Sequence, residues 1–179
     1  MARCILPISL LAGVVAFAAA ALANAPEARA DHRYIRYDTS AHRADPGYPN
    51  ETRCCWPGLW SSGIDAAVNW GNGKAYIFKG SQYIRYNIGE DRADPGYPKA
   101  INRNTWPGVW ESGIDAAINW GNGKAYFFKG DQYIRYDIAQ NRADPGYPKR
   151  VDNRNWPGLP ALGAIDSAAT WGNGKAYFF

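Results

Sequence analysis

The chain has 179 residues, 46% of them hydrophobic, which is enough for one domain with a substantial core. Lys and Arg number 20 against 16 Asp and Glu, a formal net charge of +4 at pH 7. Nucleic-acid binding needs a concentrated basic face, whereas these basic residues are spread along the chain with acidic residues among them. The composition therefore removes nucleic acid from the expected partners.

Residues 1–30 have the order of features that is typical of a secretory signal. Arg3 precedes an apolar run from Ile5 to Ala23, and small-residue cleavage patterns of the A-x-A type follow. An uncleaved membrane anchor is the alternative, because the run is nearly long enough to span a bilayer, although Pro7 interrupts it. We expect a cleaved signal and a secreted protein, extracellular or periplasmic, with no membrane attachment after cleavage.

Export would leave Cys54 and Cys55 as the cysteines of the mature chain. Adjacent cysteines cannot join distant strands, even in an oxidising compartment. A strained vicinal disulfide, an intermolecular bridge and a pair of unbonded thiols are all open interpretations.

A repeat of 50 or 51 residues occupies the rest of the chain. The stretch IDAAINWGNGKAYFF at residues 114–128 has near-copies that begin at Ile64 and Ile165. Three shorter motifs recur in a fixed order between these copies: YIRY from Tyr34, Tyr83 and Tyr133, ADPGYP from Ala44, Ala93 and Ala143, and WPG from Trp56, Trp106 and Trp156. A fixed period of this length indicates a solenoid or a propeller.

Each unit has the pattern of consecutive antiparallel strands. The apolar stretches at 114–120 and 124–130 flank Gly-Asn-Gly, so we expect a tight hairpin whose Asn-Gly turn has positive φ at both positions. Gly130-Asp131 then turns the chain into a third strand, QYIRYD, in which alternate side chains face opposite sides. Prolines end this strand in ADPGYPK, and NRNTWPGVW at 102–110 is expected to form a short helix or an outer strand.

Four antiparallel elements in one period match a propeller blade, so the sequence predicts an all-β fold. IDAA would be the innermost strand, because small residues such as Ala66 and Ala67 suit the crowding near a central axis. Larger aromatic rings would fill the outer parts, where wedge-shaped blades widen. A linear solenoid is the alternative.

The ordered pattern IDAA…KAYFFKGDQYIRYD…GYPK…WPGL resembles the hemopexin-like repeat, over the whole chain beyond the signal. That repeat occurs in hemopexin, in the C-terminal domains of matrix metalloproteinases, in plant seed albumins and in bacterial secreted proteins. The resemblance implies a β-propeller in which four blades close a disc around a narrow channel lined by the innermost strands.

This sequence holds about three blade-equivalents. Residues 31–63 would form an outer half blade, 64–113 and 114–164 two whole blades, and 165–179 an inner half blade. Three arrangements are open: a fragment of a four-bladed propeller, assembly with another chain that completes the ring, and a self-closing form in which the halves share one blade. In any open form, the apolar KAYFF edge would be a template for association.

The acid of IDAA recurs once per unit and would place oxygen atoms around the axis. Hard cations such as Ca²⁺ take about six to eight oxygen ligands from carboxylates, main-chain carbonyls and water. The resemblance implies an ion in the channel, calcium or else sodium or chloride, held largely by the main chain of this Asp and of the second Ala. The expected metal-site residues are Asp65, Ala67, Asp115, Ala117, Asp166 and Ala168. The alternative is that the aspartates only hydrogen-bond the inner turns and hold the blades in register.

Other recurring residues fit structural roles. GNGK at 71–74 lacks the long spacing and the Ser/Thr of a phosphate loop and joins two strands, so it predicts a hairpin turn. Arginines between the tyrosines of the third strand predict cation–π stacking within a blade, and the Asp before PGYP predicts a turn cap. These residues are Arg36, Arg85 and Arg135, and Asp45, Asp94 and Asp144.

The sequence gives little support to catalysis. It has no H-E-x-x-H and no G-x-S-x-G motif, and its two histidines, His32 and His42, have no counterparts in the repeat. We therefore do not expect an enzyme. Haem needs an axial ligand, for which only these histidines are plausible, so we do not expect haem as a cofactor.

The sequence thus predicts a secreted, non-enzymatic binding module, with an ion organising its inner strands and a rim or channel that recognises a small ligand or a partner protein. A linear polyamine would suit an acidic channel by its charge, and haem is the other ligand that the resemblance suggests. The alternative is a structural or interaction protein that oligomerises through open blade edges and binds no small molecule.

Overall fold

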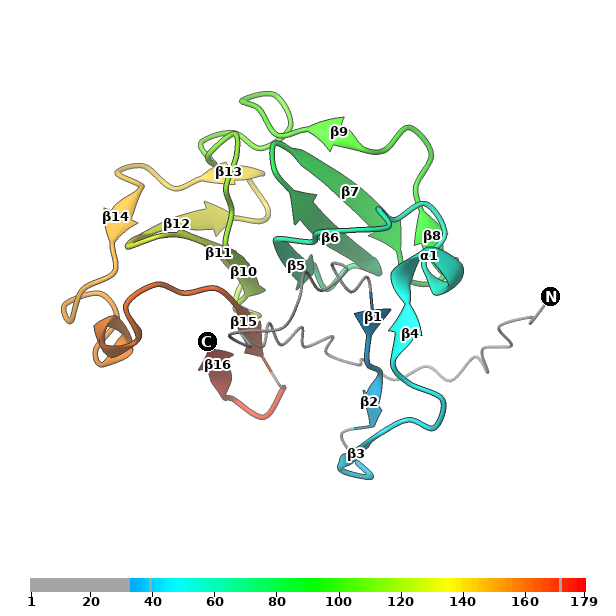
Figure 1. Cartoon of the computed structure of the whole chain (residues 1–179). Coiled ribbons are helices and arrows are strands. Elements are labelled where there is room, and N and C mark those ends of the chain that lie inside the picture. Colours follow the sequence, from blue (N-terminus) through cyan, green and yellow to red (C-terminus); the bar gives the residue numbers. More distant parts are fainter. Residues whose placement is uncertain (1–32, 39, 171) are drawn as a thin grey trace, which may run out of the picture.

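The computed structural model describes residues 33–38, 40–170 and 172–179 (Figure 1). The predicted signal at 1–30 and the candidate ligand His32 lie outside the described residues. The described chain consists of short antiparallel strands with one four-residue helix, α1 (Thr52–Cys55), and one 3₁₀ turn, η1 (Leu159–Leu162). The predicted all-β class is confirmed.

Residues 64–113 contain the first complete sheet, which we call blade 1. Its strands are β5 (Ala66–Asn69), β6 (Lys74–Lys79), β7 (Gln82–Asn87), β8 (Arg92–Ala93) and β9 (Lys99–Ala100). The first three are successive antiparallel neighbours, and both short strands pair with β7. The side chains of Ile84 and Tyr86 on β7 are buried, as expected for a strand between two packed faces.

Residues 114–164 contain the same sheet one period later, which we call blade 2. Its strands are β10 (Ala116–Asn119), β11 (Lys124–Lys129), β12 (Gln132–Asp137), β13 (Arg142–Ala143) and β14 (Lys149–Arg150). The register is also the same, because Phe78 lies opposite Tyr83 in blade 1 and Phe128 opposite Tyr133 in blade 2. A repeated sequence has therefore produced a repeated sheet.

The outer part of each blade differs from the expectation. We expected a short helix or an outer strand at 102–110, but these residues form turns. The fourth position is occupied instead by β8 and β9, which flank residues 94–98 and pair with opposite ends of β7. Pro95 and Pro98 have no N–H for a strand ladder and Gly96 has a φ of +82°, so the chain leaves the sheet between the two short pairings.

The turn between β5 and β6 uses its two glycines. Gly71 and Gly73 have φ values of +82° and +78°, whereas Asn72 is not among the residues with positive φ, so the expected Asn-Gly geometry is wrong. Trp70 N–H donates to the Lys74 carbonyl at 2.9 Å, and the Asn72 side chain accepts the Lys74 N–H at 3.2 Å. The Asn thus stabilises a three-residue turn through its side chain rather than through a left-handed backbone.

Partial units flank the two blades. In the leading unit, β1 (Arg33–Tyr34) pairs with β4 (Asn50–Glu51), and β2 (Tyr37–Asp38) pairs with β3 (Arg43–Ala44). Residues 33–38 therefore hold the place that β7 holds in blade 1. The trailing hairpin contains β15 (Ala168–Thr170) and β16 (Ala176–Phe178), the counterparts of β5 and β6.

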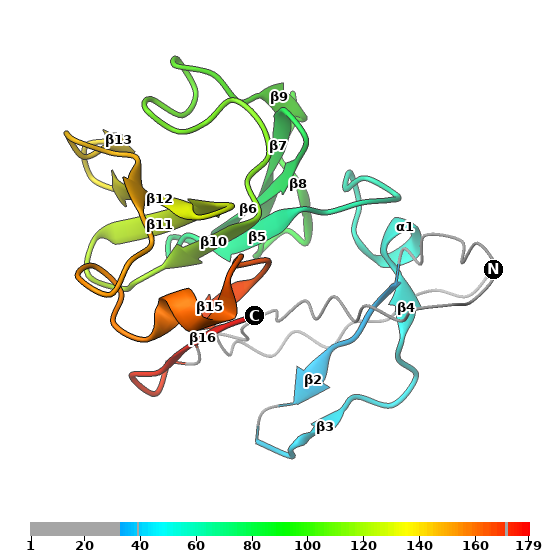
Figure 2. The same cartoon turned by 60° about the vertical axis from the view of Figure 1, so that its left-hand side comes forward.

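The inner strands of successive units lie side by side. β10 packs against both β5 and β15, and Figures 1 and 2 show these three strands at the centre with the sheets spreading outward from them. The predicted innermost position of IDAA is confirmed. The sheets of the described residues do not close into a ring.

Two hydrophobic clusters fill the space between neighbouring sheets. The first lies between blades 1 and 2 and is centred on Trp106, which is buried. Its ring lies 5.1 to 5.5 Å from six aromatic rings of both blades, those of Trp70, Tyr76, Phe78, Tyr83, Phe127 and Tyr136. The second cluster, around Trp156, joins blade 2 to the trailing hairpin. Trp106 and Trp156 lie in the segments that link successive units, and their side chains also fill the space between those units.

Candidate functional site

We call the region where β5, β10 and β15 meet the hub. Each of these strands is paired within its sheet on one side only. The other edge of each strand is therefore open toward its neighbours at the hub.

Hydrogen-bond alternation determines which main-chain groups face the hub. Trp70 donates to Lys74, and these two residues continue the register of β5 against β6. Antiparallel partners alternate between hydrogen-bonded and non-hydrogen-bonded pairs, so Ala67 and Asn69 lie at non-hydrogen-bonded positions. Their main-chain N–H and C=O groups consequently point away from β6.

Ala117 and Ala168 hold the same position on the next two inner strands. The main-chain hydrogen bonds of Trp120 beside β10 and of Phe179 beside β15 follow the same alternation. The structure thus directs the carbonyls of Ala67, Ala117 and Ala168 toward the open strand edges at the hub.

The side chain of Asn119 provides an independent check on this orientation. Its amide nitrogen lies 3.3 Å from the Asn69 carbonyl oxygen and 3.0 Å from that of Trp70. The open edge of β5 is therefore directed at β10, and a side chain of blade 2 holds the main chain of blade 1.

The carboxylates of the predicted site have a different role. Asp65 accepts the N–H of Gly80 at 2.6 Å, and Asp115 accepts the N–H of Gly130 at 2.7 Å. Both glycines form the turn between the second and third strands of a blade. The third residue, Asp166, donates its main-chain N–H to the Phe179 carbonyl at 2.8 Å. The carboxylate contacts of Asp65 and Asp115 match the turn-holding interpretation of the aspartates.

The structure therefore separates the two kinds of predicted ligand. The alanine carbonyls are directed at the hub, whereas two of the carboxylates are engaged with turn glycines. Within residues 33–38, 40–170 and 172–179, no group of three or more His, Cys, Asp or Glu side chains is placed to hold a metal.

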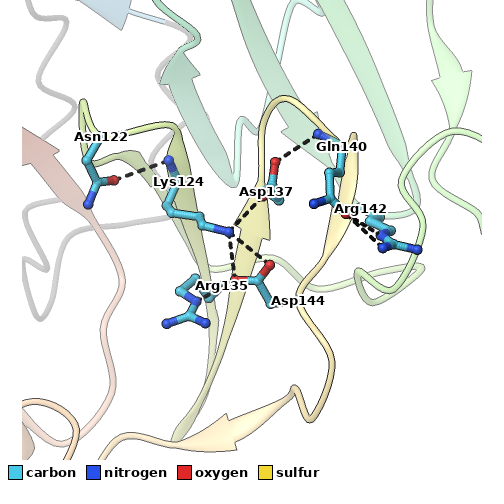
Figure 3. Close-up of polar contacts among 7 residues, drawn as sticks. All are labelled: Asn122, Lys124, Arg135, Asp137, Gln140, Arg142 and Asp144. Carbon is cyan, nitrogen blue, oxygen red and sulfur yellow. Dashed lines mark hydrogen bonds and ion pairs between the residues drawn. The ribbon is translucent and has the colours of Figure 1, made fainter.

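A charged cluster in each blade was not predicted. In blade 2, Lys124 on β11 lies 2.8 Å from Asp137 and 3.0 Å from Asp144 (Figure 3). Arg135 on β12 also pairs with Asp144, and its guanidinium lies 5.4 Å from the centre of the Tyr147 ring. The cation–π prediction for the arginines is confirmed here.

The corresponding aspartate of blade 1 has the same partners. Asp94 accepts from Lys74 at 3.0 Å and from Arg85. The expectation that these aspartates cap turns is wrong, because their carboxylates join the second, third and outer strands. The shared period of Lys74, Arg85 and Asp94 was the sequence signal that could have identified the cluster.

The cluster changes the acidity of its carboxyl groups. Burial alone would raise the pKa of Asp144, but hydrogen bonds from Lys124 and Arg135 outweigh it and hold this pKa below its ordinary value. The pKa of Asp137 is lowered as well, chiefly by its hydrogen bond with Lys124. Both aspartates are therefore charged at neutral pH and belong to the framework of the blade.

The WPG loops connect each unit to the next. The Ala143 N–H of blade 2 donates to the Pro107 carbonyl at 2.8 Å. Gly108 approaches so closely that a Cβ at this position would lie 2.6 Å from the Ala143 Cβ. These contacts fix how one blade is placed against the next, and hence how the inner strands meet.

Other predicted residues lie away from the hub. The GNGK motif forms a hairpin turn, as predicted. His42 lies in an exposed turn of the leading unit with a φ of +52°. The Cys55 side chain is buried, and that of Cys54 lies outside the described side chains. No helix in the described part of the chain is both long and apolar enough to cross a membrane.

Comparison with known proteins gives one family. The family model described as Hemopexin matches residues 64–111 and 114–161. No curated protein matches the chain.

Several solved plant proteins are similar in structure. The hemopexin fold protein CP4 from cow pea has 22% identity and a TM-score of 0.65, over 84% of this chain and 75% of that one. A Cicer arietinum albumin described as showing hemagglutination has 32% identity and a TM-score of 0.55, over 65% of this chain and 56% of that one. A Cicer arietinum lectin described as having two metal binding sites has 25% identity and a TM-score of 0.56, over 74% of this chain and 64% of that one.

Proposed function

Because this chain belongs to the hemopexin repeat family, we propose that it is a secreted, non-enzymatic binding module in which an ion at the hub organises the inner strands. The observation that carries this proposal is the equivalent placement of three alanine carbonyls on adjoining inner strands. The similarity to an albumin with hemagglutination and to a lectin supports a binding role over a catalytic one.

Calcium is the ion that suits the donors at the hub. The main-chain oxygens of Ala67, Ala117 and Ala168 are hard ligands, and water would complete the set of about six to eight oxygens that Ca²⁺ takes. The two metal binding sites named for the Cicer lectin support a metal in this fold. The ion would hold the inner edges of three sheets against one another and thereby stabilise their arrangement.

The three aspartates would contribute mainly through charge. The Asp65 and Asp115 carboxylates each have one oxygen on a turn N–H, and they stay close to the inner strands that carry the alanines. Their negative field would favour a cation at the hub, and it would also favour a linear polyamine over a neutral ligand. We propose a cationic small ligand or a partner protein at this face.

The ion can be tested with the protein purified after export. Native mass spectrometry would give its N-terminus, its mass and any bound metal. After treatment with a chelator, calcium should bind with a stoichiometry of about one in calorimetry and raise the unfolding temperature. A protein that carries no ion, and that unfolds at the same temperature with and without calcium, sodium or chloride, would contradict the proposal.

Two triple variants separate charge from structure. Changing Asp65, Asp115 and Asp166 to Asn keeps a side-chain oxygen for the turn N–H groups and removes the charge. Changing the same residues to Ala removes both. We expect the Asn variant to bind calcium more weakly while keeping most of its metal-free stability, and the Ala variant to lose metal-free stability as well. Titration of spermidine into the calcium-free protein tests polyamine binding. The same two triple variants show whether that binding needs the charge of the aspartates.

A further inference from the structure

Residues 34–38 of the leading unit are an incompletely paired copy of a strand that is buried in both blades. YIRYD here repeats YIRYN in β7 and YIRYD in β12. Ile35 and Tyr37 are 53% and 54% exposed. The equivalent residues are nearly inaccessible: Ile84 1%, Ile134 1%, Tyr86 2% and Tyr136 0%. In the blades, the second strand covers one edge of this strand. In the part of the chain that the structure describes, no strand pairs with the corresponding edge of residues 34–38.

The trailing hairpin has the complementary surface. β16 repeats β6 and β11, and in both blades the following strand pairs along its outer edge. In the described residues that edge of β16 is unpaired. Phe179 is 61% exposed, whereas Phe78 and Phe128 at the same position are 1% and 0% exposed. Among the residues that the structure describes, each of the two surfaces thus has the strand that would pair with the other.

Trp120 and Tyr37 match in the same way. Between blades 1 and 2, the Trp70 ring lies 5.4 Å from Trp106 and 6.0 Å from Tyr136. One period later, Trp120 lies 5.5 Å from Trp156, but among the described residues no counterpart of Tyr136 lies beside it, and Trp120 is 39% exposed. Tyr37 has the repeat position of the absent tyrosine.

The charges are complementary as well. Lys74 and Lys124 pair with Asp94 and Asp144 of their own blades. Their counterpart Lys175 takes part in none of the ion pairs between described residues, and Asp45, the counterpart of the two aspartates, pairs with Arg36. Pairing of the two surfaces would bring Lys175 to Asp45.

The WPG loop gives a third match. Gly108 lies against Ala143 and Gly58 against Ala93, with a built Cβ 2.6 Å from the alanine Cβ in each case. Gly158 has the same backbone conformation, with a φ of +85°, and open space around it. Ala44 is exposed and holds the repeat position of the two alanines.

Within one chain the two surfaces are held apart. The leading unit is fixed to blade 1 by the Trp56–Tyr86 ring contact of 5.0 Å and by the 2.8 Å hydrogen bond from the Ala93 N–H to the Pro57 carbonyl. The trailing hairpin is fixed to the far side of blade 2, with Phe178 5.8 Å from Phe128. Both views show β2 and β16 separated (Figures 1 and 2). One chain would have to give up one of these interfaces to join its own halves.

We propose that a second copy of this chain supplies the strand: residues 34–38 of one copy pair antiparallel with β16 of the other and form a hybrid blade. The register follows from blade 2, where Phe128 lies opposite Tyr133 and Phe127 opposite Ile134. Phe179 would therefore face Tyr34 and Phe178 would face Ile35 of the second copy. A reciprocal dimer forms two hybrid blades and leaves neither surface open.

The test measures mass by light scattering and sedimentation over a range of protein concentrations, with calcium and with chelator. The protein purified after export should have twice the mass of one chain. Ile35→Glu and Phe179→Asp change side chains that are exposed in the single chain, so the fold should persist, which circular dichroism checks. Each change should weaken association by about tenfold or more, because a charge would be buried in the new sheet. Ile88→Glu is the matched control, since Ile88 is 46% exposed and belongs to neither surface; it should leave the mass unchanged.

Mixing the two variants identifies the pairing. Ile35→Glu protein has an intact β16 and Phe179→Asp protein has an intact strand 34–38, so the mixture can form one undamaged hybrid blade and should recover a dimer. A wild-type protein that is monomeric at all concentrations, or a mixture that remains monomeric after both variants have lost the dimer, would overturn the proposal. Monomers with Ile35 protected from solvent labelling would show closure within one chain. The measurement of bound metal is a separate test, because a dimer that binds no calcium would contradict only the proposed ion at the hub.

Discussion

The amide nitrogen of Asn119 lies 3.0 Å from the main-chain oxygen of Trp70, so a side chain of one blade holds the backbone of the preceding blade. The two residues are 49 positions apart in the sequence. This contact is a direct link between the inner parts of adjacent blades in the described structure.

Asn119→Ala should destabilise the protein more than Asn69→Ala does. Both side-chain oxygens accept the N–H of a turn glycine, Gly121 at 3.0 Å and Gly71 at 2.9 Å, so both variants lose that bond. Only Asn119 also donates to the neighbouring blade. The difference in the free energy of unfolding should be about 1 kcal/mol, measured by urea denaturation. Equal losses for the two variants would mean that the link between the blades contributes nothing.

Gly108→Ala should be much more damaging than Gly158→Ala. The two glycines have φ values of +83° and +85°, so an alanine meets the same backbone strain at both. Only at Gly108 would the new Cβ collide with Ala143, at 2.6 Å. Below the protein concentrations at which copies associate, the steric excess should be about 1–3 kcal/mol in the free energy of unfolding. If both variants unfold at the same denaturant concentration, the close approach of the loop to blade 2 is incorrect.

Trp70→Ala and Trp120→Ala test packing between blades with the same chemical change. Trp70 is buried among aromatic rings of both blades, and its loss should cost about 3–5 kcal/mol. Trp120 is partly exposed and buries less area. Trp120→Ala should therefore lower the free energy of unfolding by about half as much or less. Thermal unfolding at protein concentrations below those at which copies associate gives the comparison. A larger cost for Trp120 under these conditions would contradict the packing.

Stability should fall as acid protonates the aspartates of the charged clusters. The folded-state pKa of Asp144 lies below its ordinary value of about 3.9, because the hydrogen bonds from Lys124 and Arg135 outweigh the effect of burial. Such a group contributes stability above its unfolded pKa, and this contribution is lost as pH falls through the folded pKa. The unfolding temperature should therefore drop steeply below about pH 4, and Asp144→Asn should flatten that dependence.

A matched control for this pH effect is Asp131→Asn. Asp131 pairs with Arg150 on the surface, where the two side chains are 61% and 76% exposed, and exposed ion pairs contribute little. Its acid profile should follow that of the unmodified protein. Identical profiles for all three proteins would show that the cluster has no part in acid unfolding.

The local features of the fold could be predicted from the sequence because they depend on short patterns. The 50-residue period, the strand pairs around GNG and the innermost position of IDAA follow from spacing and residue size, and the structure confirms them. The family relationship rests on the same ordered motifs.

The remaining features depend on contacts between distant residues. Nothing near Asp94 in the sequence shows that its partner Lys74 lies 20 positions earlier, and turn capping was the local alternative. The split of the outer strand around residues 94–98 likewise depends on β7 accepting two short partners, one at each end. For the candidate site, the alanine positions came from the resemblance to the hemopexin-like repeat, whereas the hydrogen bond of Asp115 to Gly130 depends on where the next turn comes back.

The WPG loop of one unit contacts the following blade, and this contact has a consequence for how a gene with such repeats can gain or lose a unit. Gly63 and Gly113 share a positive φ and each precedes an isoleucine, so excising residues 64–113 would join two equivalent junctions. The loop that now meets Ala93 would then meet Ala143 in the same geometry. Recombination between repeats could thus lengthen or shorten the protein by whole periods while keeping the close approach of the loop to the next blade.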